Sequence, residues 1–244
     1  LIGISSVSFC FDEAIGIAKK IKEAGANIPV LIGGAHISGL PVSIRYNCFD
    51  IGVVGEGEET FLELIRTYKK NKKFTSDILE NIKGICFIKN GEVCLTEHRQ
   101  YMQDLNLLPH FDKNFLKENN ALPYLITSRG CPFHCKYCQS DAVWGGKVRF
   151  HSAEYIFDDI LEIKNLYPDD NRIIFKDDNF TVSIKFLEQL KEKKEKLEQI
   201  TGRQTYFIGS THVNFITHDL LKILKSLNVR KVNFGIETIS DKLL

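Results

Sequence analysis

With 244 residues and 43% hydrophobic content, the chain is long enough to bury one large or two ordinary hydrophobic cores. Its 32 basic and 31 acidic residues leave a net charge of +1, so no charge excess marks a surface for nucleic acid or anionic membranes. We expect a small-molecule substrate and no nucleic acid. No run of about 18 apolar residues and no signal-peptide pattern is present, which indicates no membrane span and a cytoplasmic location.

The first third of the chain alternates apolar runs with helical periodicity. We expect strands at residues 1–6, 30–32 and 51–54, with helices over 14–24 and 61–68. Strands without polar alternation are typical of a parallel sheet that is covered on both faces. Because an apolar run is already in progress at Leu1, we expect the chain to be an excerpt of a longer protein, truncated at both ends.

A hairpin is predicted over residues 84–96, because Asn90-Gly91 is a strong signal for a two-residue turn. In that register Phe87 lies opposite Cys94, and Cys86 and Cys94 point to opposite faces of the hairpin. These two thiols therefore cannot share a metal ion. We interpret both as ordinary buried cysteines.

An irregular linker is expected over residues 99–120, and the alternation of strands and helices then resumes. Ser152 is a plausible N-cap for the first helix of this part. The expected strands are 124–127, 172–175, 206–208 and 231–234, and the expected helices are 156–163, 185–199 and 219–227.

Three cysteines follow the first of these strands at the spacing C-x3-C-x2-C: Cys131, Cys135 and Cys138. A loop with these gaps can wrap an iron–sulfur cube so that each thiolate holds one iron, while the fourth iron has no protein thiolate. An iron with open positions can accept the amine and carboxylate of the methionine end of S-adenosylmethionine. The spacing therefore predicts a four-iron four-sulfur cluster.

A zinc site and a set of unrelated core thiols are the alternatives. Structural zinc takes four ligands, usually from two separated pairs, and this chain lacks a second pair. His134 is a conceivable fourth ligand, but it directly precedes Cys135, which is awkward geometry for one ion. An apolar core gives no reason for three cysteines beside Gly130 and Pro132.

The sequence SRGCPFHCKYC, followed by Trp144-Gly145 and by residues 147–150, resembles the motif of the radical S-adenosylmethionine (radical SAM) superfamily in its cobalamin-binding branch. The resemblance implies a partial β/α barrel. It also implies that the cluster passes one electron to S-adenosylmethionine, which splits into methionine and a 5'-deoxyadenosyl radical that takes a hydrogen atom from the substrate. An electron donor such as ferredoxin or flavodoxin is then the expected partner.

The same resemblance implies contacts to S-adenosylmethionine from the ends of the later strands. Asp177 and Asp178 follow the second barrel strand and match the family's acidic stretch, while Glu237 follows the fourth strand. Where relatives often have an arginine after the third strand, this chain has His212 nearby. We assign no role to His212.

The segments GISS, GGAHISGLP and VVGEGEET resemble the later strands of a cobalamin-binding domain. Ligands of open α/β sheets bind at the carboxyl ends of the strands, where these segments lie. The Asp-x-His-x-x-Gly motif that supplies a cobalt ligand in such domains is absent, so we do not assign cobalt ligation to His36. A docking domain without cobalamin is the alternative. The residues that would line the groove for the cobalamin nucleotide tail are Ser5, Ser6, Gly33, Gly34, His36, Gly55, Glu56 and Gly57.

The expected architecture is α/β throughout. Residues 1–75 would be the C-terminal part of a doubly wound, Rossmann-like cobalamin-binding domain, residues 76–120 a hairpin and linker, and residues 121–244 the N-terminal part of a partial radical SAM barrel. The expected reaction is cobalamin-dependent methyl transfer to an unactivated carbon. A cobalamin-linked radical cyclase or rearrangement enzyme and a non-catalytic, zinc-stabilised binding module are the alternatives.

Overall fold

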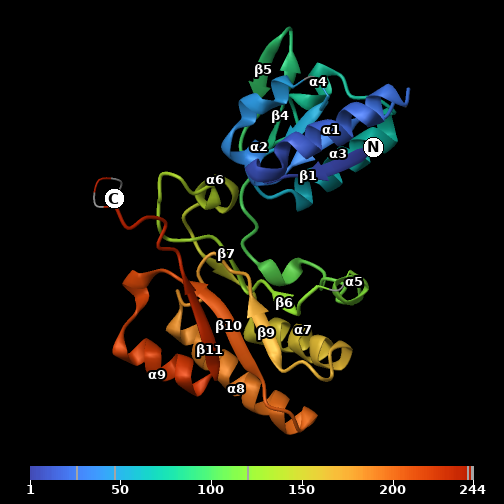
Figure 1. Cartoon of the computed structure of the whole chain (residues 1–244). Coiled ribbons are helices and arrows are strands. Elements are labelled where there is room, and N and C mark those ends of the chain that lie inside the picture. Colours follow the sequence, from blue (N-terminus) through green and yellow to red (C-terminus); the bar gives the residue numbers. More distant parts are fainter. Residues whose placement is uncertain (26, 47, 120, 241, 243–244) are drawn as a thin grey trace. The chain divides into compact units, whose positions relative to one another are not determined.

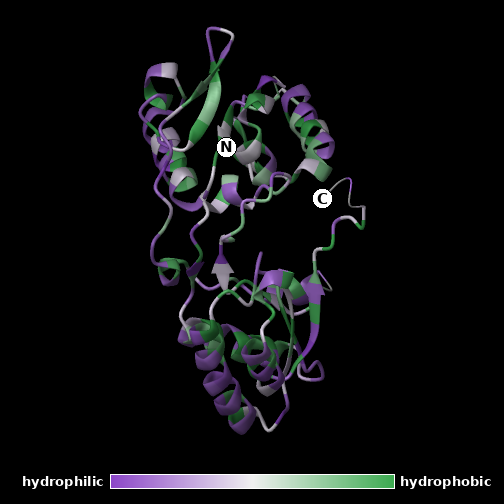
Figure 2. Ribbon diagram, turned by 90° about the vertical axis from the view of Figure 1, so that its left-hand side faces the viewer, coloured by the Kyte–Doolittle hydropathy of each residue, from purple (hydrophilic) through white to green (hydrophobic). Residues whose placement is uncertain are grey.

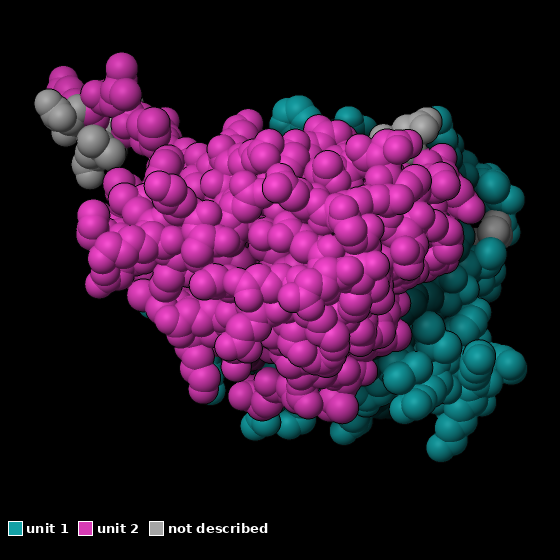
Figure 3. Space-filling model, turned by 90° about the horizontal axis from the view of Figure 1, so that it is seen from below, with its two compact units in different colours: residues 1–102, 131–147 teal, residues 103–130, 148–244 magenta. Residues whose placement is uncertain are grey.

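The computed structural model describes residues 1–25, 27–46, 48–119, 121–240 and 242 (Figure 1). The chain forms two compact units, which Figure 3 shows in two colours. The first unit consists of Leu1–Met102 and Cys131–Lys147, and the second of Gln103–Gly130 and Val148–Leu244. The units therefore interleave along the sequence, whereas the sequence analysis expects three consecutive segments that meet at residues 75 and 120.

The first unit contains a five-stranded sheet in the order β1-β2-β3-β4-β5. The first three strands are parallel, β4 is antiparallel to β3, and β5 is antiparallel to β4. Phe87 lies opposite Cys94, so the register predicted for the hairpin is confirmed. The hairpin is not part of a linker, because it extends the first sheet. The strands are β1 (Ile2–Ser5), β2 (Val30–Gly33), β3 (Ile51–Val53), β4 (Ile85–Lys89) and β5 (Glu92–Leu95).

Helices cover both faces of this sheet, which explains why its strands lack polar alternation. On β2, Val30 and Ile32 pack in one buried cluster with residues of α1 (Phe11–Glu23). Leu31, which points to the opposite face, packs in a second cluster with Leu64 of α3 (Glu58–Asn71) and with residues of α4 (Ser76–Leu79). The short helix α2 (Ala35–Gly39) follows β2 directly, and the 3-10 turns η1 (Ser8–Cys10) and η2 (Pro41–Arg45) flank α1 and α2.

The second unit contains a parallel sheet in the order β11-β10-β9-β6. Its helices pack into one buried cluster with the sheet, and Ser152 caps the first of them as predicted, because its Oγ accepts a hydrogen bond from Tyr155 N at 3.1 Å. The strands are β6 (Tyr124–Leu125), β9 (Arg172–Phe175), β10 (Tyr206–Thr211) and β11 (Val229–Phe234), and the helices are α7 (Ala153–Leu166), α8 (Ile184–Thr201) and α9 (His218–Ser226).

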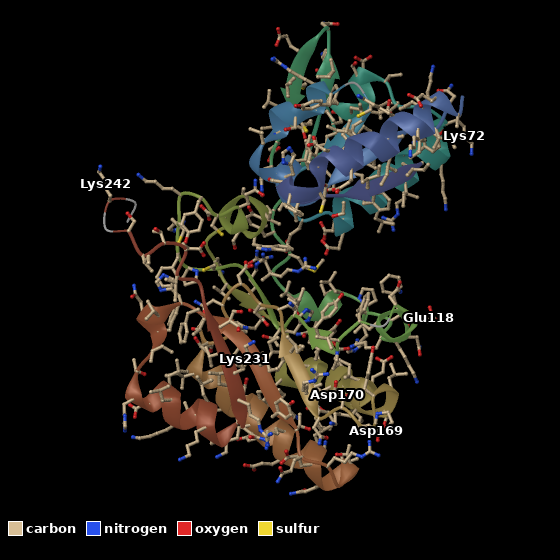
Figure 4. The ribbon with its side chains drawn as sticks, viewed as in Figure 1. Lys72, Glu118, Asp169, Asp170, Lys231 and Lys242 are labelled. Carbon is tan, nitrogen blue, oxygen red and sulfur yellow. The ribbon has the colours of Figure 1, made fainter. Side chains whose placement is uncertain are left out.

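Burial alternates along β10, where Phe207 is fully buried and its neighbours Tyr206 and Ile208 are half-buried. This alternation indicates that the helices bury one face of the sheet. Figure 2 shows the helices with both hydrophilic residues, in purple, and hydrophobic ones, in green. At the start of β9, Asp170, which Figure 4 labels, accepts hydrogen bonds from the Arg172 guanidinium.

The region between the sheets is more regular than the sequence predicts. The expected linker contains the 3-10 turn η3 (Leu105–Leu107) and the helix α5 (Asn114–Glu118). A two-residue antiparallel pair, β7 (Ser128–Arg129) with β8 (Arg149–Phe150), and the helix α6 (Ser140–Trp144) were not predicted. In the described part of the chain, no helix is long and apolar enough to cross a bilayer.

Candidate functional site

The cysteine loop, residues 131–138, runs from the end of β7 to the start of α6. None of its three cysteines forms a disulfide: Cys131 and Cys135 are half-buried and Cys138 is exposed. Cys138 N donates a hydrogen bond to Cys135 O at 2.9 Å, which folds the second half of the loop into a tight turn. The sulfur of Cys138 accepts a hydrogen bond from Ser140 N at 3.4 Å.

The described residues include no group of three His, Cys, Asp or Glu side chains arranged around a point where one metal ion would sit. In an iron–sulfur cube each thiolate binds a different iron, so the sulfurs lie further apart than the ligands of a single ion. His134, the conceivable fourth ligand of a zinc site, instead pairs with Asp141, with 3.2 Å between Nδ1 and Oδ2. The arrangement therefore gives a zinc ion no set of four ligands among the described residues.

The loops after β1, β2 and β3 are tied together at the carboxyl edge of the first sheet. Ser6 N donates to Gly33 O at 2.9 Å, and a Cβ atom on Gly34 would lie only 2.6 Å from Ser6 O. Gly34 has a φ of 95°, a conformation that favours glycine. Ser5 stands beside it, since its Oγ would lie 2.9 Å from the same Cβ position. The expected Ser5, Ser6, Gly33 and Gly34 thus lie side by side at the surface of this edge, where Ser5 is exposed and Ser6 is buried.

Ser38 connects this surface to the next loop, although the sequence analysis did not select it. Its hydroxyl donates to Gly34 O at 2.9 Å and accepts from Gly55 N at 3.0 Å. A serine four residues after Gly34, on the first turn of a short helix, is a signal that could have identified it. The residue is buried, so its role is to hold the two loops together.

The turn from Gly55 to Gly57 is covered by other residues of the first unit. A Cβ atom on Gly55 would lie 3.5 Å from His98 Nε2 and 3.8 Å from Val143 O. Glu56 Oε2 accepts a hydrogen bond from Met102 N at 2.7 Å. Gly57 precedes α3 as its N-cap residue. Of the three residues, Gly55 is buried, and Glu56 and Gly57 are half-buried.

Both ring nitrogens of His36 have partners within the first unit. Nδ1 lies 3.0 Å from Ser8 Oγ and Nε2 lies 2.9 Å from Ser43 Oγ. The ring stacks on Phe11 with 3.7 Å between the centroids. Burial lowers the pKa of His36, so the neutral ring is favoured at neutral pH. Both ring nitrogens of His36 therefore face serine hydroxyl groups.

Asp177 lies two residues beyond β9 and is held by the strand segment that leads into the cysteine loop. Its Oδ1 accepts hydrogen bonds from Thr127 N at 3.0 Å, from Thr127 Oγ1 at 2.7 Å and from Ser128 Oγ at 2.6 Å. Its Oδ2 is buried without a hydrogen-bond partner. Burial raises the pKa of Asp177 despite these three donors. Sequence reasoning selected the carboxylate but not its donors Thr127 and Ser128.

A buried polar cluster joins the ends of β9 and β10. Asn179 Oδ1 lies 3.2 Å from Thr211 Oγ1 and 3.3 Å from Thr181 Oγ1, and the two threonine hydroxyls lie within hydrogen-bonding distance of each other, so two hydroxyl protons are shared among three oxygens. Asn179 Nδ2 is buried without a partner. Buried donors rarely stay unpaired, so this edge of the sheet has an unused hydrogen-bonding group. The sequence analysis did not identify this cluster.

Asp178 and Glu237 are exposed, unlike Asp177. Glu237 has a φ of 55°, which is uncommon for a residue other than glycine. A Cβ atom on Gly235 would lie 2.8 Å from Glu237 Oε1, so the glycine leaves room for the carboxylate to fold back. His212, to which we assigned no role, accepts a hydrogen bond from Asn214 N through Nδ1.

The fold and the loop define a class: an α/β protein with three closely spaced cysteines, none of them in a disulfide, in the loop that follows β7. Residues 125–244 match the family model described as the Radical SAM superfamily. Residues 125–244 therefore form a domain of this superfamily, whose cofactors are S-adenosylmethionine and a 4Fe-4S cluster.

Relatives and solved structures resemble the chain over nearly its whole length. An uncharacterised methyltransferase of Pyrococcus horikoshii is 30% identical and aligns with 100% of this chain and 53% of its own length. Cytidylyl-2-hydroxyethylphosphonate methyltransferase of Streptomyces wedmorensis is 36% identical, over 100% of this chain and 51% of its own. The structure of TsrM from Kitasatospora setae, a radical S-adenosylmethionine methyltransferase with cobalamin and a 4Fe-4S cluster bound, has a TM-score of 0.76 at 16% identity and covers 99% of this chain and 49% of that one. The chain thus spans about half the length of these proteins.

Proposed function

We propose that this protein is a radical SAM enzyme in which Cys131, Cys135 and Cys138 hold the 4Fe-4S cluster. The observation that carries the proposal is the position of three cysteines without disulfides in one short loop after β7, within the residues that match the family. Three thiolates satisfy three irons and leave the fourth open to a chelating ligand. When bound, the cluster supplies the electron that splits S-adenosylmethionine into methionine and a 5'-deoxyadenosyl radical.

The carboxylates at the ends of the second sheet would bind the ammonium group and the ribose of S-adenosylmethionine. Asp178 and Glu237 are exposed and follow β9 and β11, where groups at the carboxyl ends of parallel strands converge. Asp177 would contribute indirectly. Its Oδ1 accepts hydrogen bonds from Thr127 and Ser128 and so holds the segment before the cysteine loop in place. Because each cleavage consumes one electron, a ferredoxin or flavodoxin is the expected redox partner.

The reaction we propose is cobalamin-dependent methyl transfer to an unactivated carbon of a small molecule. Two relatives are named as methyltransferases, and TsrM is described with cobalamin bound. In this chain, the edge formed by Ser5, Ser6, Gly33 and Gly34, with His36 and the turn from Gly55 to Gly57, would line the groove for the cobalamin tail. The close backbone approach at Gly34 keeps this edge free of a side chain.

Anaerobic reconstitution with iron and sulfide tests the cluster. The wild type should turn brown, absorb broadly near 400 nm and bind about four iron ions per chain, as a 4Fe-4S cluster requires. Cys135→Ala should lose the cluster and S-adenosylmethionine cleavage. Cys94→Ala is the matched control, because Cys94 lies on the hairpin of the first sheet. Equal losses in the two variants would refute the cysteine assignment, and one colourless zinc ion per chain would support the binding module instead.

Incubation with hydroxocobalamin, followed by desalting and absorbance spectroscopy, tests the second cofactor. We expect cobalamin to stay with the protein that carries the cluster. A protein that assembles the cluster and releases all cobalamin would still be a radical SAM protein, but it would contradict the proposed methyl transfer.

A further inference from the structure

The residue that follows the cysteine loop is anchored on the first unit. Residues 131–147 belong to that unit together with residues 1–102, and α6 packs against α2. Gln139 stands between Cys138 and α6 and is the N-cap residue of this helix. Its side chain is therefore placed to connect the last cysteine of the loop with α2 and its neighbours.

The end of α2 leaves a space for this side chain. A Cβ atom on Gly39 would lie 2.9 Å from Gln139 Nε2 and 3.2 Å from both Cδ and Cγ. Contacts this short do not persist between a Cβ atom and a packed side chain, so any larger residue at position 39 would displace Gln139. The glycine thus accommodates the glutamine at the last position of α2.

A hydrogen bond holds the Gln139 amide in this space. Its Nε2 donates to Ser8 Oγ at 3.2 Å, and the same oxygen lies 3.0 Å from His36 Nδ1. A hydroxyl group can accept one hydrogen bond while it takes part in another, so Ser8 connects the glutamine to the histidine. His36 is itself fixed by Ser43 and by stacking on Phe11. The hydrogen-bonded chain from Gln139 through Ser8, which we call the anchor, therefore ends on His36, whose ring is held by several contacts.

The anchor acts next to the sulfur of Cys138. Cys138 N donates to Cys135 O, and Cys138 Sγ accepts from Ser140 N, so hydrogen bonds flank Gln139 on both sides. Fixing the side chain of Gln139 fixes the backbone between these two bonds, and with it the direction of the Cys138 sulfur. Hydrogen bonds and the orientation of ligating thiolates influence the electronic properties of iron–sulfur clusters.

We propose that Gln139 is a positioning residue that ties the Cys138 end of the cysteine loop to Ser8 of the first unit. The proposal rests on the proposed role of Cys138 as a cluster ligand. The loop is then docked before any cofactor binds, and the sulfur of Cys138 has a set direction. Ser8 lies in η1, three residues after the end of β1, so the anchor connects the cysteine loop to the segment that leaves this strand.

Hydrogen exchange of the full chain without cofactors tests the docking. In Gln139→Ala and Ser8→Ala, amides of residues 131–147 should exchange roughly two- to tenfold faster than in the wild type, the effect of losing one neutral hydrogen bond. Ser8→Thr keeps the hydroxyl and should restore slow exchange. Ser226→Ala is the control, because Ser226 also makes a single hydroxyl bond, to Ile223 O at the end of α9. Unchanged exchange in both anchor variants would overturn the proposal.

Electron paramagnetic resonance of the reconstituted and reduced protein tests the positioning of Cys138. Gln139→Ala and Ser8→Ala should keep the iron content of the wild type and shift the g values of the cluster, while Ser8→Thr and Ser226→Ala should match the wild type. Anchor variants with wild-type spectra would overturn the positioning role. A wild type that binds no cluster would instead refute the proposed function, and the exchange experiment would still decide whether Gln139 docks the loop.

Discussion

Asp177 concentrates its hydrogen bonds on one carboxylate oxygen and leaves the other without a partner. Desolvation disfavours the charged form, and this raises the pKa of Asp177 although Thr127 and Ser128 donate to it. For a group whose pKa is higher in the folded than in the unfolded state, the stability contribution is complete below the unfolded pKa and is lost as pH rises through the folded pKa. Ionisation of Asp177 therefore weakens the second unit as pH rises above about 4.

Asp177→Asn separates the charge from the hydrogen bonds, because asparagine keeps an acceptor oxygen and cannot ionise. In urea unfolding, the free energy of unfolding of this variant minus that of the wild type should increase as the pH rises from about 4 to about 7. Asp177→Ala should lose about 1–3 kcal/mol, because buried donors of Thr127 and Ser128 lose their acceptor. Asp178→Ala, at an exposed position, should change stability by less than about 0.5 kcal/mol. A difference between wild type and Asp177→Asn that is independent of pH would contradict the raised pKa.

The same residues show how much of the candidate site the sequence predicts. The three cysteines were selected for their short, local spacing after an expected strand, and Asp177 because its segment resembles the acidic stretch of the family. Thr127 and Ser128 were not found, since their hydrogen bonds to Asp177 span about 50 residues and depend on the pairing of β6 with β9. Ser38 was missed for a related reason: it bridges two loops that become neighbours only in the folded sheet.

At the scale of elements, the segment before β6 is fastened to α7 by a buried ion pair. Lys113, fully buried at the start of α5, pairs with Asp159 of α7 and lies 3.6 Å from Glu162 Oε2. His110 Nδ1 lies 2.8 Å from Asp159 Oδ1. The ring of Tyr155 stacks on those of His110 and His151, at centroid distances of 4.0 Å and 4.2 Å. The part of the expected linker from Gln103 onward therefore belongs to the second unit and packs against α7.

Asp159→Ala should destabilise the second unit by about 3–5 kcal/mol, because it leaves the ammonium group of Lys113 buried without its main partner. Combining Lys113→Met with Asp159→Leu should recover most of this loss, since two apolar side chains replace the pair without leaving a charge. Asp158→Ala is the control at an exposed neighbour. Urea unfolding followed by circular dichroism measures all three. A small loss in Asp159→Ala would show that the pair does not hold the segment.

Elements with a long, clear period were predicted well, and the short elements on either side of the cysteine loop were not. The five-residue helix α6 and the two-residue strands β7 and β8 carry too few positions for a period to emerge. The hairpin of β4 and β5 was predicted with its register, because its turn is encoded locally. Its pairing with β3 was not predicted, since that contact depends on the whole sheet.

At the scale of the whole molecule, the two units have separate hydrophobic cores, and the sequence order of the chain does not follow their boundary. The first unit has buried clusters on both faces of its sheet, whereas one cluster joins the second sheet to its helices. In the sequence, residues 131–147 lie between two segments of the second unit, yet they belong to the first unit. Residues of the same unit should therefore share one free energy of unfolding, whatever their positions in the sequence.

Two unfolding transitions are expected for the full chain, and the amides of residues 131–147 should lose protection together with the first unit. Ile32→Ala should lower the stability of the first unit by about 2–5 kcal/mol, and Phe207→Ala that of the second by about 3–5 kcal/mol, because each removes a fully buried side chain. Hydrogen exchange at increasing urea concentrations measures which segments respond. If residues 131–147 follow Phe207→Ala instead of Ile32→Ala, the cysteine loop is not docked on the first unit.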